Sequence, residues 1–150
     1  MSGMTPIRSF DELTPGQVFE LGSFSLPRAE VLDFASRYDP QPFHLDEAAA
    51  QDSIFGRLVA SGAHTFSAAL GHLIRSGLLA EVNLGGGGVE LAWPAPLAPD
   101  EAVTMRVTVE ELRPSRSKPG MGIARLRYRV ATERDGTVVL DALATHFLKR

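Results

Sequence analysis

Apolar residues in the first half of the chain recur at the spacing of a helix. From Phe66 to Leu78 they fall at positions i, i+3, i+4, i+7, i+8 and i+12, which predicts an amphipathic helix over about residues 62–80. Arg75 is the only charged residue within that span. We therefore expect this helix to be buried on most of its sides.

A second, shorter helix is predicted to begin after Ser25 and Pro27, because a serine cap and a first-turn proline suit the free N–H groups of a helix start. Pro40 and Pro42 should end it, since neither donates a backbone N–H and each disfavours helical backbone in the preceding residue. Between these limits the apolar and aromatic residues follow helical spacing: Val31, Phe34, Ala35 and Tyr38.

In the second half of the chain the apolar period changes from 3.6 to 2. Residues 101–112 and 124–130 alternate apolar with polar or charged side chains, which predicts strands with one buried and one solvated face. Residues 137–148 are apolar on both sides, as in a central strand, and Asp135-Gly136 before them predicts a tight hairpin. Two further strands are predicted, at residues 17–24 and 88–93.

These elements together predict an α+β fold. One long buried helix and a run of antiparallel strands fit a curved sheet wrapped around the helix, whereas a parallel sheet needs strands and helices in alternation. The 150 residues suit one domain over residues 1–150, large enough to bury a core. A sheet wrapped around one helix leaves its open side uncovered, so we expect a homodimer or a higher homo-oligomer.

Composition narrows the class of function. The chain is 44% hydrophobic and 22% charged, as in ordinary globular proteins, and its net charge of −3 gives no reason to expect nucleic acid or a membrane as partner. It contains no cysteine, which excludes disulfides, thiolate metal sites and a cysteine nucleophile. Without a secretory signal or an apolar stretch of membrane-spanning length, the expected location is the cytoplasm.

Candidate chemistry is concentrated in residues 38–46, where two carboxylates and an imidazole lie within a loop stiffened by two prolines. A carboxylate beside a histidine suits proton transfer near neutral pH, so Asp39 and His44 are a candidate acid–base pair. The spacing alone leaves a structural alternative open, in which Asp39 caps a turn and His44 is a partly buried polar residue.

The segment YDPQPFHLDEAAA, followed by FGRLVASGAHT, resembles the hydratase-2 motif of the MaoC-like dehydratases, a family that includes the (R)-specific enoyl-CoA hydratases. The resemblance covers most of the chain and implies a hot-dog fold, in which a curved antiparallel sheet wraps a long central helix. It also implies that Asp39 and His44 are the catalytic residues. The chain departs from many of these hydratases by having Gln41 in place of Asn, and Ser61-Gly62 in place of His-Gly.

Gly62 stands at the predicted start of the long helix. A glycine there lets backbone approach a ligand, and its N–H lies at the positive end of the helix dipole, where it can polarise a thioester carbonyl. The resemblance implies the same role. Close packing of the helix against the sheet explains this glycine as well. Ser61 is expected to cap the helix, and Gln41 and Ser61 are expected to bind substrate.

The remaining candidates are weaker. Arg116 and Lys118 lie in the basic loop RPSRSKPGMG and could bind the phosphates of coenzyme A, although an ordinary solvated loop explains them equally well. Gly85 to Gly88 lack the Lys-Ser/Thr of a phosphate loop and favour a turn or a strand close to ligand. His64 and His72 are eight residues apart, which is not a metal-pair spacing, so no metal site is expected.

The resemblance implies reversible hydration of a trans-2-enoyl-CoA to a (3R)-3-hydroxyacyl-CoA, without a cofactor. The acyl group could be carried by coenzyme A or by acyl carrier protein. Two alternatives remain. One is a hot-dog acyl-CoA thioesterase, against which the Asp-x4-His spacing argues; the other is an acyl-thioester-binding subunit of low activity.

Overall fold

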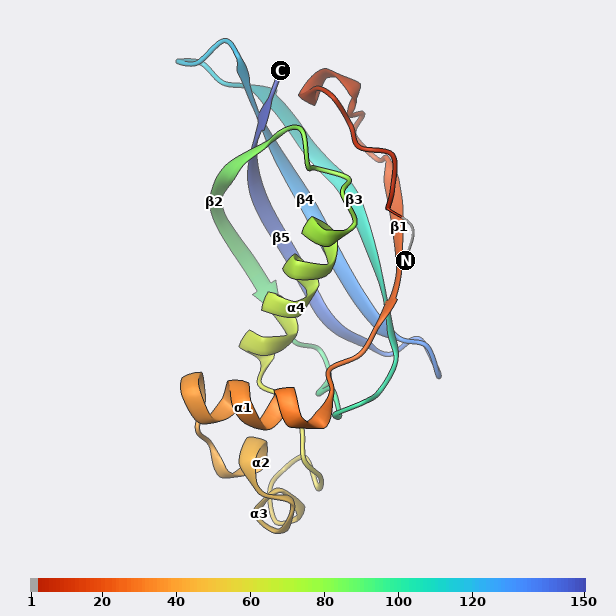
Figure 1. Ribbon diagram of the computed structural model, residues 1–150, viewed down its shortest axis with the longest axis vertical. Coiled ribbons are helices and arrows are strands. Elements are labelled where there is room, and N and C mark those ends of the chain that lie inside the picture. The colour runs from red at the N-terminus through yellow and green to blue at the C-terminus, as the bar shows by residue number, and fades with distance from the viewer. Residues whose placement is uncertain (1–2) are drawn as a thin grey trace.

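The computed structural model describes residues 3–150 and contains a curved, five-stranded antiparallel sheet with a helix lying against its concave face (Figure 1). The strand order is β1-β3-β4-β5-β2, so β1 and β2 form the two edges. The elements, in chain order, are a short 3-10 helix (Phe10–Glu12), β1 (Val18–Phe24), α1 (Arg28–Tyr38), α2 (Pro42–Leu45), α3 (Glu47–Gln51), α4 (Gly62–Arg75), β2 (Asn83–Ala92), β3 (Val103–Pro114), β4 (Met121–Thr132) and β5 (Val138–Lys149).

The predicted α+β class is confirmed, and the sheet follows the period-2 pattern. Every second residue of β3 from Val103 to Val109 is buried against the concave face, while the residues between them face outwards. The register pairs Val107 with Tyr128 on β4, so the buried positions of neighbouring strands lie opposite one another. β5 lies between β4 and β2, as its two apolar sides predicted.

α4 is shorter than its apolar pattern predicted. It ends at Arg75, and the turn that follows is made by Ser76 and by Gly77, whose φ of +83° is the left-handed conformation that terminates helices. Leu78 is buried, as its position in the pattern suggested, but it belongs to this turn. The helix is also less enclosed than expected, because Ile74 is 44% exposed.

α1 begins and ends close to the predicted positions, but its start is built differently. Pro27 is the N-cap residue, and no side-chain cap comes from Ser25 or any other local residue. Asp100, distant in sequence, accepts a hydrogen bond from the backbone N–H of Arg28 at 3.2 Å. A long-range contact therefore stabilises the start of α1, which no local pattern could have indicated.

The glycine run Gly85 to Gly88 is part of β2, a strand that begins earlier than predicted. At Gly87 a Cβ atom would lie 2.7 Å from the ring of Phe147 on β5, closer than real side chains approach. In the part of the chain that the structure describes, β2 pairs with β5 only, so its other edge keeps unpaired backbone groups. Two apolar side chains of β2, Leu84 and Val89, are also exposed.

A polar network runs from the core beside α4 to the exposed Asn83. The hydroxyl of Tyr128 donates to Nε2 of His146, and Nδ1 of His146 donates to Asn83 at 3.1 Å. Burial lowers the pKa of His146 to about 4 and raises the pKa of Tyr128 far above its usual value. Both groups are therefore neutral at physiological pH, which is what this chain of hydrogen bonds requires.

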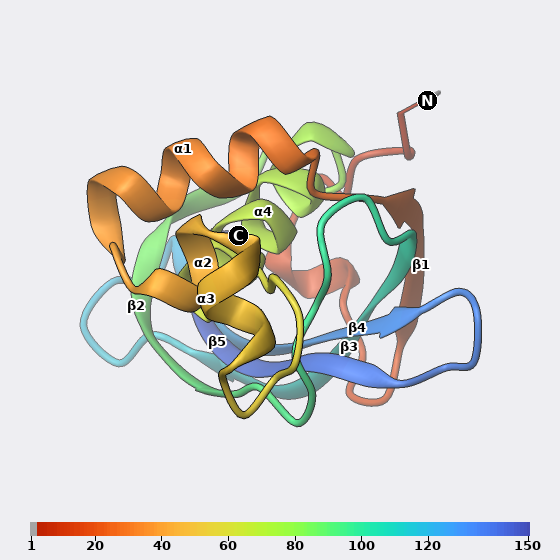
Figure 2. The same cartoon turned by 90° about the horizontal axis from the view of Figure 1, so that it is seen from below.

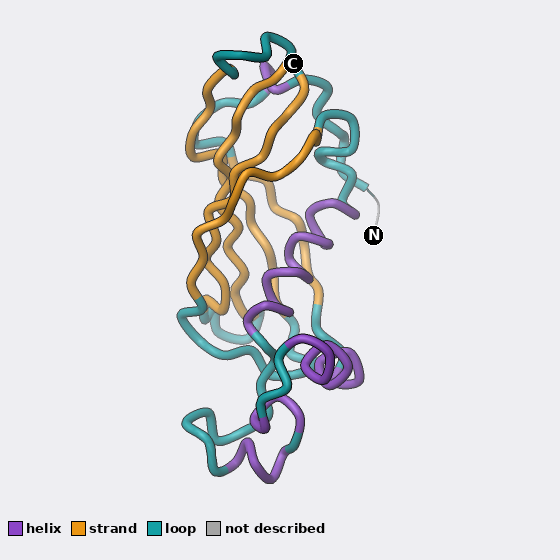
Figure 3. Tube along the Cα trace, turned by 90° about the vertical axis from the view of Figure 1, so that its left-hand side faces the viewer, coloured by secondary structure: helices purple, strands orange, loops and turns teal. Residues whose placement is uncertain are grey.

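The helices α1, α2 and α3 cover one end of the sheet, around the start of α4 (Figures 2 and 3). They carry residues 38–46 to the N-terminus of α4. Among residues 3–150, no helix is both long and apolar enough to cross a bilayer.

Candidate active site

Two short turns bring Asp39 and His44 together. Asp39 is the C-cap of α1 and leaves helical backbone with φ −155° and ψ 68°. Pro42 then starts α2, where its missing N–H costs nothing because the first turn of a helix has no acceptor for it. The single turn of α2 brings His44 next to Asp39. Pro40 and Pro42 thus end one helix, as predicted, and start the next.

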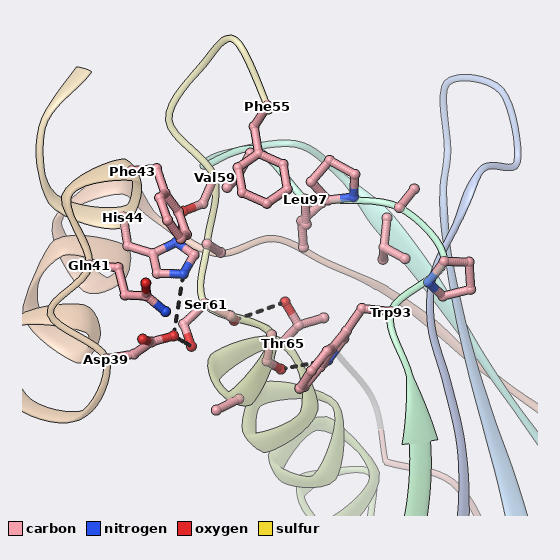
Figure 4. Close-up of a pocket in the computed structure, with 17 residues that line it drawn as sticks. Asp39, Gln41, Phe43, His44, Phe55, Val59, Ser61, Thr65, Trp93 and Leu97 are labelled. Carbon is pink, nitrogen blue, oxygen red and sulfur yellow. Dashed lines mark hydrogen bonds and ion pairs between the residues drawn. The ribbon is translucent and has the colours of Figure 1, made fainter. Parts of the chain in front are cut away.

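The imidazole of His44 has a defined orientation. Its Nδ1 donates to the carbonyl of Val59 at 2.7 Å, because a carbonyl can only accept. In the neutral ring, Nε2 therefore carries a lone pair, and it lies 3.3 Å from Oδ2 of Asp39 (Figure 4). His44 is buried whereas the Asp39 side chain is 27% exposed, so the pair reaches solvent from the carboxylate side.

Ser61 contacts the same carboxylate oxygen of Asp39 that faces His44. It is the N-cap residue of α4, as predicted, but its side chain makes no capping hydrogen bond. Its hydroxyl instead donates to Oδ2 of Asp39 at 2.7 Å, and the residue is 1% exposed. Charge-assisted hydrogen bonds of this kind are among the stronger ones in proteins. Ser61 therefore fixes the orientation of Asp39 relative to His44.

The N-terminus of α4 opens into the same site. Within residues 3–150, the backbone N–H groups of Gly62 and Ala63 have no protein acceptor. They lie at the positive end of the α4 dipole, where negative charge is stabilised. A Cβ atom at Gly62 would lie 2.2 Å from the indole of Trp93, so close packing does require glycine here. The role of Gly62 in catalysis stays a prediction.

A cavity of about 470 Å³ joins these groups. Asp39, His44 and Gly62 line it, and so do Gln41 and Ser61, the two residues predicted to bind substrate. Apolar side chains form most of the remaining wall: Phe43, Phe55, Val59, Trp93, Leu97 and Val139. A mainly apolar cavity with a few convergent polar groups is typical of a site for a small organic substrate.

Arg116 and Lys118 are not brought to this cavity. They lie in the hairpin between β3 and β4, at the opposite end of the sheet from α1, α2 and α3 (Figure 1). Neither residue lines the cavity, and neither does any other lysine or arginine. Within residues 3–150, no group of three or more His, Asp or Glu residues is arranged to hold a metal ion.

Sequence reasoning missed Trp93 and the carbonyl of Val59. Trp93 follows directly on β2 and donates from Nε1 to the carbonyl of Gly62 at 2.9 Å. Its place in the site depends on the pairing of β2 with β5, a contact between distant segments. The available signal was that Trp93 is the only tryptophan in the chain and precedes Pro94 at the end of a predicted strand.

Solved structures resemble this one closely. A MaoC-like dehydratase from Rhodospirillum rubrum is 37% identical, with a TM-score of 0.86 over 93% of this chain and 95% of that one. An (R)-hydratase from A. caviae involved in PHA biosynthesis is 30% identical, with a TM-score of 0.65 over 91% and 96% of the two chains. A Mycobacterium tuberculosis protein with a double hot-dog fold shares the fold, with 21% identity, a TM-score of 0.77 and coverage of 94% and 44%.

These likenesses confirm the hot-dog fold that the sequence resemblance implied. The family described as MaoC like domain matches residues 11–130, which include the whole of the Asp39–His44 segment and α4. The chain therefore belongs to the MaoC-like domain family, whose members include hydratases and dehydratases.

Proposed function

We propose that this protein catalyses the reversible addition of water to a trans-2-enoyl thioester, giving a (3R)-3-hydroxyacyl thioester. The observation that carries the proposal is the convergence of Asp39, His44 and the free N–H groups of α4 on one mainly apolar cavity. The (R)-hydratase named above supports the same reaction class. An acid–base pair and an oxyanion donor are the two components that this reaction needs.

The chemistry follows from the placement of these groups. A water molecule hydrogen-bonded to both Asp39 and His44 gives one proton to the pair as its oxygen attacks C3 of the substrate. Electrons move through the C2–C3 double bond onto the thioester oxygen, where the Gly62 N–H stabilises the enolate. The pair then returns the proton to C2, so that one water is added in total. Every group in this scheme carries a proton or donates a hydrogen bond, so it requires no metal or redox cofactor.

The enzyme is expected to lower the absorbance of the enoyl-thioester band when given trans-2-butenoyl-CoA. The competing activity, hydrolysis of saturated butanoyl-CoA, should be slower, and a thiol reagent measures it directly. Because the protein contains no cysteine, such a reagent reports released coenzyme A alone. Faster release of coenzyme A than hydration would replace the proposal with a thioesterase. Tight binding without either reaction would identify an acyl-thioester-binding subunit.

The acyl carrier is proposed to be coenzyme A, and the assembly a homodimer. Antiparallel pairing of two β2 edges would bring the partner's β3–β4 hairpin to the end of the sheet that holds the cavity. The partner's Arg116 and Lys118 would then supply the cations that the cavity lacks within one protomer. In this proposed arrangement Arg116 and Lys118 serve the cavity of the other copy, so they need not lie near Asp39 of their own chain.

We expect the double variant Arg116→Ala/Lys118→Ala to raise the KM for enoyl-CoA and to leave kcat nearly unchanged, because phosphate contacts are made equally in the ground and transition states. Arg106→Ala/Arg129→Ala removes the same charge from the outer face of the sheet and serves as control. An unchanged KM in the first variant would make the hairpin an ordinary surface loop. Light scattering should give a dimer for the parent and for both variants.

A further inference from the structure

Trp93 forms a wall of the cavity at the point where the substrate's thioester is proposed to bind. Its indole stands across the cavity from Asp39 and His44, with Ser61 and the start of α4 between them (Figure 4). The ring packs so closely on Gly62 that a Cβ atom there would lie 2.2, 2.5 and 2.7 Å from three of its carbon atoms. No space for a methyl group remains between the indole and the helix start.

Two features keep this wall in place although Trp93 is 50% exposed. Nε1 donates to the carbonyl of Gly62 at 2.9 Å, which fixes the ring against α4. Pro94 follows and restricts the backbone of Trp93 to extended conformations, because the proline ring disfavours the helical region in the residue before it. The ring is therefore held from both its tip and its backbone.

We infer that Trp93 is a specificity-determining residue that excludes acyl thioesters substituted at C2. The inference rests on the proposed function, since it assumes that the thioester oxygen binds at the Gly62 N–H while C3 faces Asp39 and His44. C2 then lies between these two points, and a methyl group on it meets the indole unless the chain shifts away from the catalytic pair. Unbranched 2-enoyl thioesters fit without such a shift.

The first test compares trans-2-butenoyl-CoA with trans-2-methyl-2-butenoyl-CoA, which differ by one methyl group at C2. In Trp93→Ala the ratio of kcat/KM for the unbranched over the branched substrate should fall at least about 10-fold, since one carbon in a shaped pocket discriminates about 10- to 200-fold. Phe55→Ala is the matched control, because Phe55 lines the same cavity from the loop between α3 and α4, and its truncation enlarges the cavity at a different point. A ratio that stays constant in Trp93→Ala, or falls equally in Phe55→Ala, would overturn the inference.

A second test needs no turnover. Gly62→Ala should lower the melting temperature strongly, and adding Trp93→Ala should restore much of that loss, because the clashing ring has been removed. Adding Phe55→Ala to Gly62→Ala should restore nothing. Additive losses of melting temperature in the Gly62→Ala/Trp93→Ala variant would show that the Trp93 ring does not pack against Gly62. A parent that hydrates neither substrate would overturn the proposed function, and the specificity with it, whereas an unchanged ratio in an active variant would overturn the specificity alone.

Discussion

Asp39→Asn and His44→Ala are each expected to lower kcat/KM for enoyl-CoA hydration by at least about 100-fold, the lower end of the contribution of general acid–base catalysis. Asparagine keeps the size of Asp39 and can still accept from Ser61, but it cannot take a proton from water. His44→Ala removes the ring whose Nε2 faces the carboxylate at 3.3 Å. The measurement is the initial rate of absorbance loss with trans-2-butenoyl-CoA.

The effects of the two substitutions should not add. Both groups are proposed to act on one water molecule, so the double variant should be about as slow as the slower single variant. Full additivity with an intact fold would mean that Asp39 and His44 act in separate steps. Hydration at the parental rate in Asp39→Asn would show that Asp39 is not a catalytic residue of this reaction.

The matched control for this pair is Asp33→Asn. Asp33 lies on the same helix as the turn that holds Asp39, but it is exposed, pairs with Arg37 at 3.2 Å and does not line the cavity. Its substitution should leave the hydration rate within experimental scatter, because exposed ion pairs contribute little. Melting temperatures of all variants must stay near that of the parent, so that lost activity is not lost folding.

Leu73→Asp is expected to cost more than about 4 kcal/mol of folding free energy, a large part of the roughly 5–15 kcal/mol that stabilises a natural domain. Leu73 is fully buried on α4 against the sheet, so the new carboxylate would have neither water nor a partner. Leu70 is only partly buried, so Leu70→Asp should cost less, and Ser67→Asp on the exposed side of the helix should cost little. Urea unfolding followed by circular dichroism gives the three values. Equal midpoints for Leu73→Asp and Ser67→Asp would mean that α4 is not the core element.

The sheet was the most predictable part of the molecule. In β3 and β4 the polarity of each residue indicates which face of the sheet its side chain lies on, since the side-chain period of a strand is 2 and neighbouring strands repeat the same alternation. The end of α4 was less predictable. Leu78 continues the apolar period because the core needs it, while Gly77 turns the chain out of the helix before it. An apolar pattern thus records burial more reliably than it records where a helix ends.

The candidate site could be predicted in the part that is local in sequence. Asp39 and His44 lie five residues apart, and the prolines around them confine the loop. The groups that orient them come from elsewhere: Val59 supplies the acceptor for Nδ1, and the Ser61 hydroxyl turns to Asp39 rather than to its own helix. The contact of Trp93 with Gly62 joins residues 31 positions apart through sheet pairing. Such contacts carry no periodic signal.

An open sheet with two free edges could in principle grow without limit, and the two edges of this sheet are unlike. β1 spans 7 residues and is interrupted between Glu20 and Ser23, where Gly22 takes a φ of +75°. A short length and a bulge of this kind hinder the addition of further strands to an edge. β2 is longer, at 10 residues, and carries exposed apolar side chains, although its register with β5 also shifts, between Asn83 and Gly85 and between Gly86 and Gly88. In the proposed dimer, pairing through β2 occupies that edge in both copies at once, which leaves the short, interrupted β1 as the edge at each outer end.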